Sequence, residues 1–151
     1  LSSEPPPGSA ARVLARIETA LFAAPGFKTV HAVSELAAHP HVRFSGIAQD
    51  APLRLVSGDK TVDMKVNTVF RANTSEALLQ ALESGIGIGG MQLPLAAHAL
   101  QSGRLVPVLP AWRLPDRVLY AVYPDARFIP PRVRSIIDVI EQLLPEMTES
   151  V

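Results

Sequence analysis

Histidine is the first residue type to consider as a source of chemistry, and the chain has four, at positions 31, 39, 41 and 98. His39 and His41 flank Pro40, which could bring two imidazoles close together, but no acidic residue stands at a spacing that would complete a metal site. His98 lies in the apolar run Ala-Ala-His-Ala-Leu, typical of a packed or surface position rather than a catalyst. The chain has no cysteine, which excludes thiolate sites and disulfides. We therefore expect no metal.

Hydroxyl and carboxylate groups do not form a catalytic pattern either. Ser45 precedes Gly46, but the Gly-x-Ser-x-Gly sequence of a nucleophile elbow is absent. Asp50, Asp59 and Asp63 surround an expected hairpin and read as solvated, and no two carboxylates share a helical face suited to acid–base work. We predict no catalytic residue, no cofactor and no enzyme activity.

A glycine-rich run, Gly85 to Gly90, superficially resembles a phosphate-binding loop. Such loops follow a strand and open a helix, whereas Gly85 closes an expected helix and the later glycines lie in an expected strand. The alternation of glycine with Ile86 and Ile88 instead indicates a strand that other backbone, or a ligand, approaches closely.

Composition limits the class of protein. The 151 residues suit one domain or two small lobes, and 48% apolar against 19% charged residues is typical of a globular chain. Fourteen basic and fourteen acidic residues cancel, so the chain shows no electrostatic footprint for nucleic acid. No apolar run reaches the roughly 18 residues of a membrane span, and no signal segment opens the chain, so we expect the cytoplasm and no membrane contact. Because it begins with Leu1 rather than methionine, we expect a fragment.

The central stretch predicts a βαβαβ unit with a parallel sheet. Asn73 is the expected N-cap of the first helix, with Glu76 completing a capping box. Apolar residues at helical spacing follow, and Gly85 ends the helix. The expected elements are a strand at 66–72, a helix at 74–84, a strand at 86–90, a helix from Pro94 to Ser102 and a strand at 105–109.

The flanking segments are shorter and more broken. Residues 12–24 fit either one helix or two strands by spacing. Elsewhere the patterns predict a linker at 1–10, a helix at 35–38 capped by Ser34, a strand at 42–44, a hairpin of 53–56 with 62–66, a turn at Leu114-Pro115-Asp116, a strand at 118–123, and a helix from Pro131 to Leu144 stopped by Pro145, with an apolar stripe of Val133, Ile136, Ile137, Ile140 and Leu144.

The order of several segments resembles the effector-binding domain of LysR-type transcriptional regulators. The residues that carry the likeness are A-N-T-S-E-A-L-L-Q-A-L-E-S-G-I-G-I-G-G-M at 72–91, S-G-R-L-V-P-V-L-P-A-W at 102–112, L-Y-A-V-Y-P at 119–124, P-P-R-V-R-S-I-I-D-V-I at 130–140, and, upstream, 11–25 and 34–44. The likeness favours strands over a helix at 12–24. It implies an α/β fold, a periplasmic-binding-protein-like (type 2) lobe with a mostly parallel sheet flanked by helices. It further implies three parts: a linker and crossover at 1–24, a second lobe at 25–112, and the return strand and last helix of the first lobe at 113–151.

The resemblance also implies a small effector held in a cleft, with Phe44, Ser45 and Gly46 on one wall. Independently, open parallel sheets bind ligands at the carboxyl ends of their strands, where helix N-termini favour anions. Asn73 and Thr74 stand at such a position, so we expect a small, anionic metabolite. Asn73 would also be explained by capping alone, without a ligand. Met91 is a candidate for the cleft, but it fits core packing equally well.

A second expected surface is the first helix of the central stretch. In the resembling family this helix pairs two effector domains, which implies a homodimer or higher oligomer with Leu79, Leu82 and Glu83 facing outward. The DNA-reading helix-turn-helix of that family would lie upstream of Leu1, so DNA would be bound only through that missing part. The alternative is a solute-binding protein of a transport system, and the residues upstream of Leu1 would discriminate the two.

Overall fold

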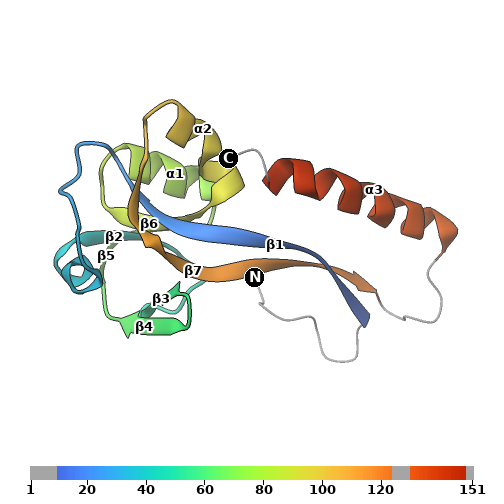
Figure 1. The fold of residues 1–151 in the computed structure, drawn as a ribbon, viewed down its shortest axis with the longest axis horizontal. Helices are drawn as coiled ribbons and strands as arrows, with labels where there is room; N and C mark the ends of the chain where they lie inside the picture. Colours follow the sequence, from blue (N-terminus) through green and yellow to red (C-terminus); the bar gives the residue numbers. More distant parts are fainter. Residues whose placement is uncertain (1–9, 124–129, 149–151) are drawn as a thin grey trace. The chain divides into compact units, whose positions relative to one another are not determined.

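The structure is a computed structural model that describes residues 10–123 and 130–148. Most of the expected linker at 1–10, and Pro124, lie outside the described residues. The elements in chain order are β1 (Ala10–Ala23), the 3-10 helix η1 (Val33–Ala38), β2 (Pro40–Phe44), β3 (Leu53–Ser57), β4 (Lys60–Met64), β5 (Asn67–Ala72), α1 (Ser75–Glu83), β6 (Ile88–Gln92), α2 (Leu93–Gln101), β7 (Val106–Tyr123) and α3 (Pro131–Thr148) (Figure 1).

The chain divides into two compact units. Unit 2 is Glu18–Pro115, and unit 1 combines Leu1–Ile17 with Asp116–Val151. The chain therefore passes between the units twice, once within β1 and once within β7. The boundaries expected from the sequence, after residues 24 and 112, lie a few residues inside unit 2, whose limits are Glu18 and Pro115.

The sheet of unit 2 is mixed, so the expected mostly parallel sheet is wrong in that detail: more of the described strand pairs are antiparallel than parallel. The strand order is β4-β3-β7-β1-β6-β2-β5, and β2 runs parallel to both β5 and β6. β6 pairs antiparallel with β1, and β3 pairs antiparallel with β4 and β7. The expected strands of the βαβαβ unit are present, but the third of them, β7, lies beside β1 and β3 rather than in the parallel set. Local sequence patterns do not predict the order of strands in a sheet, because that order depends on pairing between residues far apart in the chain.

Apolar side chains pack on both faces of this sheet. Successive strand residues point to opposite faces, so Phe22 of β1 belongs to one core cluster while Leu21 and Ala23 belong to the other. The first cluster lies under α1 and α2, which Figure 1 shows on the same side of the strands of unit 2. The second cluster includes Leu36 of η1 and Leu55 of the β3–β4 hairpin, both 0% exposed. Unit 2 thus buries a layered core.

Gly87, just before β6, and Gly89, within it, permit an unusually close approach of backbone. A Cβ built on Gly87 would lie 2.4 Å from the carbonyl oxygen of Pro40, and one on Gly89 would lie 2.6 Å from that of Val42. The expectation that these glycines admit other backbone is confirmed, and the neighbour is β2. At the end of α1, Gly85 adopts a φ of +72°, which confirms the expected helix end.

Several expected boundaries are wrong. Residues 12–23 form neither a helix nor two strands but part of one strand, β1. No turn forms at Leu114-Pro115-Asp116, because β7 runs on for 18 residues and pairs with β3 at Arg113. Proline, which cannot donate to a ladder, suggested a break there, but the long-range pairing carries the strand through it.

Two helix ends also differ from expectation. η1 begins at Val33 with Ala32 as N-cap, so Ser34 lies inside its first turn and caps nothing, while the Glu35 carboxylate accepts from the His31 amide at 3.1 Å. α3 continues through Pro145 to Thr148. Proline has no backbone N–H to donate, so α3 runs past Pro145 without one of its backbone hydrogen bonds.

In unit 1, α3 pairs with β1 through Arg12. Its guanidinium donates to Glu141 at 2.6 Å and lies 3.9 Å from Asp138. Ile137 is buried at 7% exposure, whereas Ile136 is 61% and Ile140 is 38% exposed. The expected single apolar stripe is therefore wrong for Ile136 and Ile140, which face outward.

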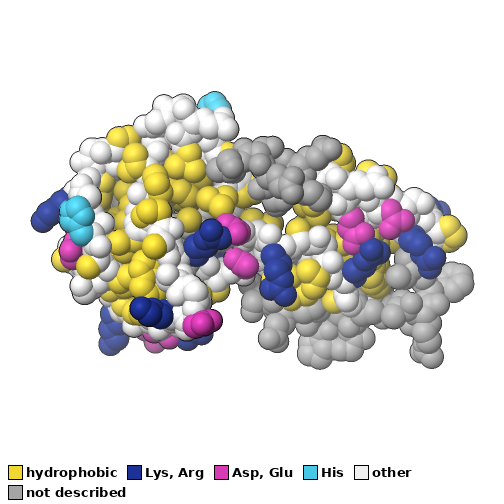
Figure 2. All heavy atoms as spheres, viewed as in Figure 1, with side chains coloured by type: hydrophobic (Ala, Val, Ile, Leu, Met, Phe, Trp, Pro, Cys, Tyr) yellow, Lys and Arg dark blue, Asp and Glu magenta, His cyan; other side chains and the backbone are white. Residues whose placement is uncertain are grey.

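Over the face drawn in Figure 2, basic and acidic side chains of the described residues are interspersed, without one large basic patch. None of the described helices is both long and apolar enough to cross a membrane.

The close approach of β6 to β2 generates a stability prediction. Gly87→Ala should lower the free energy of unfolding by roughly 1–3 kcal/mol, because the added methyl meets main chain that cannot move without breaking the sheet. Gly26→Ala is the matched control, since its Cβ would meet nothing within 4 Å. Urea denaturation measures both variants, and equal stability of the two would contradict the account.

Buried His41 generates a pH prediction. It is 1% exposed, and its Nε2 donates to the Leu36 carbonyl at 2.9 Å. Burial lowers the pKa of His41 below its usual 6.5, outweighing the opposing effect of that hydrogen bond, and nearby Arg43 and His39 lower it further. Because the unfolded chain binds this proton more readily, the contribution of His41 to stability is complete above about pH 6.5 and is lost as the pH falls toward the folded-state pKa.

The measurement is the unfolding free energy of wild type and His41→Gln between pH 8 and pH 5. Glutamine keeps a donor near the Leu36 carbonyl but does not titrate, so wild type should lose more stability than the variant over this range. Parallel curves would show that His41 does not carry the effect, because the other histidines titrate in both proteins.

Candidate ligand-binding site

The candidate site is built by the paired ends of β2 and β5. Phe44 and Ala72 are register partners in this parallel pair, so both strands end at the same edge. The Ser45 amide then donates to the Ala72 carbonyl at 2.8 Å, which ties the two following turns together. This brings together five residues that the sequence analysis selected from distant positions, and we call them the candidate edge: Phe44, Ser45, Gly46, Asn73 and Thr74.

The polar side chains of the candidate edge are available to a ligand. Ser45 and Asn73 are exposed, and neither side chain makes a hydrogen bond within the described part of the chain. Phe44 is half-buried against the first core cluster, and its ring covers Gly46 so closely that a Cβ there would lie 2.5 Å from the ring. Gly46 therefore lets the ring of Phe44 lie over the turn.

Thr74, and not Asn73, caps α1. The Thr74 hydroxyl accepts from the Ala77 amide at 3.3 Å, and Thr74 has the extended backbone of an N-cap. The expected Asn73 cap and its capping box with Glu76 are wrong, because β5 and the bend after it place Asn73 one residue too early. Capping therefore no longer explains Asn73.

The β2 and β5 strands carry two arginines that the sequence analysis missed. Arg43 and Arg71 are register partners, and both bind backbone carbonyls of the residues after β2. Among the described residues, neither forms an ion pair with a carboxylate. Burial lowers the pKa of Arg43, and the nearby Arg71 charge lowers it further, yet an arginine stays charged at neutral pH. A signal existed in the sequence: both strands end with arginine between apolar residues, Val-Arg-Phe and Phe-Arg-Ala.

Met91 is buried rather than exposed at the candidate edge. It is 1% exposed and packs in the first core cluster with Phe22 and Leu82. Its role in ligand binding is untested and stays a prediction, while its packing role is established.

The residues expected to form a dimer surface have different environments. Leu82 is 0% exposed in the core, so its expected outward orientation is wrong; at the helical period it shares the face of Leu78. Leu79 is half-buried and packs against the same cluster. Their place in a dimer stays a prediction.

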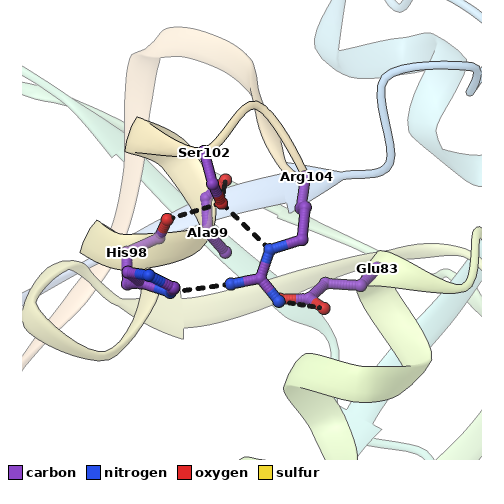
Figure 3. Close-up of polar contacts among 5 residues, drawn as sticks. All are labelled: Glu83, His98, Ala99, Ser102 and Arg104. Atoms are coloured by element: carbon purple, nitrogen blue, oxygen red, sulfur yellow. Dashed lines mark hydrogen bonds and ion pairs between the residues drawn. The ribbon is translucent and has the colours of Figure 1, made fainter.

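Glu83 belongs to a polar network that joins α1 to α2 (Figure 3). Arg104 donates to Glu83 at 3.0 Å, to the Ser102 hydroxyl at 2.9 Å and to His98 Nδ1 at 2.8 Å, and Ser102 donates to the His98 carbonyl at 2.7 Å. The other carboxylate oxygen of Glu83 is buried without a hydrogen-bond partner. Glu83 and His98 thus act in the contact between two helices. Among the described residues, no group of three His, Asp or Glu side chains could hold a metal ion.

A comparison with protein families identifies the chain. Residues 1–145 match the model of the LysR substrate binding domain. The chain belongs to this family. Its relatives include the HTH-type transcriptional regulator PtxR of Pseudomonas aeruginosa, 40% identical over 73 residues that cover 48% of this chain and 23% of PtxR. They also include the HTH-type transcriptional regulator YhjC of Escherichia coli, 29% identical over 150 residues that cover 94% of this chain and 50% of YhjC. The chain spans half or less of the length of these relatives.

Solved structures share the fold of this LysR substrate-binding domain. The regulatory domain of CrgA from Neisseria meningitidis matches with a TM-score of 0.75 at 23% identity, covering 92% of this chain and 70% of that one. Full-length AphB of Vibrio cholerae matches with a TM-score of 0.75 at 23% identity, covering 91% of this chain and 48% of AphB. The expected α/β, periplasmic-binding-protein-like class is confirmed. The relatives are named as transcriptional regulators, which does not favour the transport alternative.

The cap assignment is tested by two substitutions. Thr74→Ala should lower the free energy of unfolding by about 1 kcal/mol, because it removes the acceptor of the Ala77 amide. Asn73→Ala should change the free energy of unfolding by less than about 0.5 kcal/mol, because substitutions of exposed side chains that make no specific contact usually have small effects. Thermal or urea unfolding measures both, and the reverse order would restore Asn73 as the cap.

Proposed function

We propose that this chain is the effector-binding part of a DNA-binding transcriptional regulator, and that it binds a small anionic metabolite at the candidate edge. The observation that carries the proposal is that Ser45 and Asn73 follow the paired ends of β2 and β5, and that both side chains are exposed and have no hydrogen-bond partner among the described residues. Ligands of open α/β sheets bind at this end of the strands. The family and the names of the relatives support the regulatory role.

Charge supports an anion as the effector. Arg43 and Arg71 are the penultimate residues of β2 and β5, and neither forms an ion pair with a carboxylate of the described residues. The first turn of α1 follows Thr74, and helix N-termini attract negative charge through their backbone amides. The acidic residue in this turn, Glu76, offsets part of that field. A carboxylate near Ser45 and Asn73 would therefore meet donors and a positive potential.

The proposal also covers the protein around this chain. DNA would be bound by a part outside these residues, and effector binding would bias the conformation of a dimer or higher oligomer. Leu79 and Glu83 remain candidates for its contact. A regulator of this kind would act in the cytoplasm, on chromosomal DNA, and without enzymatic turnover.

The experiment is a thermal-shift screen of the full-length protein against aliphatic and aromatic carboxylic acids. A ligand at 100 times its Kd stabilises the protein it binds by about 2.7 kcal/mol, which is readily visible. Ser45→Leu should abolish the shift, because the larger apolar side chain occupies the candidate edge. Ala37→Leu is the control: Ala37 is also exposed, but it precedes β2 and so lies at the other end of that strand.

Two results would contradict the proposal. If no acid stabilises the full-length protein, the anionic effector is wrong. If an acid stabilises wild type and Ser45→Leu equally, its site is elsewhere.

A further inference from the structure

The residues that follow β2 form a loop, 45–52, made of two consecutive turns. The Ile47 amide donates to the Phe44 carbonyl and the Ala51 amide to the Ala48 carbonyl, each at 3.1 Å. Apolar packing holds this loop only weakly, because Ile47 and Ala51 are half-buried while the other six residues are exposed. Something else must fix its position on the sheet.

Each turn is held by one arginine from a different strand. Arg71 of β5 donates from Nη2 to the Ser45 carbonyl at 3.0 Å and to the Ile47 carbonyl, both in the first turn. Arg43 of β2 donates from Nη1 to the Ala51 carbonyl at 2.7 Å and from Nη2 to the Pro52 carbonyl at 3.4 Å, at the end of the second turn. The two guanidiniums lie side by side on the same face of the sheet because their residues are register partners.

These contacts are costly to assemble, which argues that they have a use. Arg43 is 7% exposed, and its positive charge and that of the nearby Arg71 repel each other, while no carboxylate in the described part of the chain forms an ion pair with either. Arg71 Nη1 is buried with no partner, so part of its donor capacity is unused. A chain that needed only a stable sheet would do better with apolar residues at these positions. Carbonyl oxygens are the groups that both arginines bind, and the loop supplies all of them.

We propose that Arg71 and Arg43 are positioning residues that hold the 45–52 loop, and with it Ser45 and Gly46, in the geometry that receives the effector. Neither arginine contacts the effector in this arrangement. Arg71 binds the carbonyl of Ser45 itself, so it acts directly on the residue at the candidate edge, while Arg43 fixes the far end of the loop. The proposal rests on the proposed function, because the loop is taken to be one wall of the effector site.

Hydrogen–deuterium exchange of the full-length protein without effector tests the positioning role. In Arg71→Met, amides of the loop should exchange about 10-fold faster than in wild type, whereas those of α2 should be unchanged. In Arg71→Lys the loop amides should exchange at a rate between those of wild type and Arg71→Met, because the lysine ammonium keeps the charge but reaches the same carbonyls less well. Arg54→Met is the control: it removes an arginine from β3, a strand of the same sheet that pairs with β4 and β7, and the side-chain partner of Arg54 is Asp63, outside the loop.

The proposal is supported if the exchange rate of the loop amides increases from wild type to Arg71→Lys to Arg71→Met and the increase is confined to the loop. Unchanged loop exchange, or an equal increase in every segment of unit 2, overturns it. If Arg71→Met does not fold, faster loop exchange in Arg71→Lys than in wild type still decides the question in the same way.

A second arm measures the dissociation constants of salicylate and citrate, as probes of aromatic and aliphatic acids. If either binds wild type, Arg71→Met should weaken it about 10-fold, Arg71→Lys should recover part of the loss, and Arg54→Met should leave it unchanged. Equal binding by wild type and Arg71→Met overturns the positioning role. If neither probe binds wild type, the result counts against the proposed function, and the exchange measurement decides the loop proposal by itself.

Discussion

The parallel pairing of β2 with β5 and β6 is the constraint on which the rest of unit 2 depends. Gly87 and Gly89 let β6 approach the backbone of β2 at distances that no side chain would allow. With β2 held on one side in this way, its pairing with β5 on the other places Phe44 opposite Ala72. Parallel strands share a carboxyl edge, and the chain leaves both strands there in exposed turns. The candidate edge is therefore a consequence of backbone packing.

The same edge concentrates polar groups that an isolated sheet would avoid. Arg43 is buried, and its partners among the described residues are carbonyl oxygens of the loop that follows its own strand, with no carboxylate. Arg71 supports the first turn of that loop in the same manner. By contrast, Arg104, on the helical side, has Glu83 as a charged partner and ties α1 to α2. The charge of Arg104 thus serves to join two helices, whereas the charges of Arg43 and Arg71 stay uncompensated by any carboxylate of the described residues, beside the proposed anion site.

Local patterns were sufficient for much of the fold. Gly85 and Pro94 marked helix limits correctly, Gly58-Asp59 marked the β3–β4 hairpin, and the resemblance led to the family that the comparison confirms. The candidate edge residues, Ser45 and Asn73, were chosen from strand ends and are brought together by the β2–β5 register. Their binding role is a proposal. Parallel strands end at one edge, so the sequence placed both residues at that edge, but only the pairing of β2 with β5 made them neighbours.

The remaining features were decided by contacts between residues far apart in the chain. β7 runs through Pro115 as one strand, and its neighbours in the sheet, β3 and β1, come from distant parts of the chain. Leu82 faces inward because the side of α1 that carries it packs in the first core cluster. Arg71 and the Ser45 carbonyl it binds are 26 residues apart. By itself the sequence determined most of the helices and strands, though not the long strands β1 and β7, because caps, glycines and apolar periods act over a few residues. Only the tertiary structure decided strand neighbours and arginine partners, because those depend on which backbone groups folding brings within hydrogen-bonding distance.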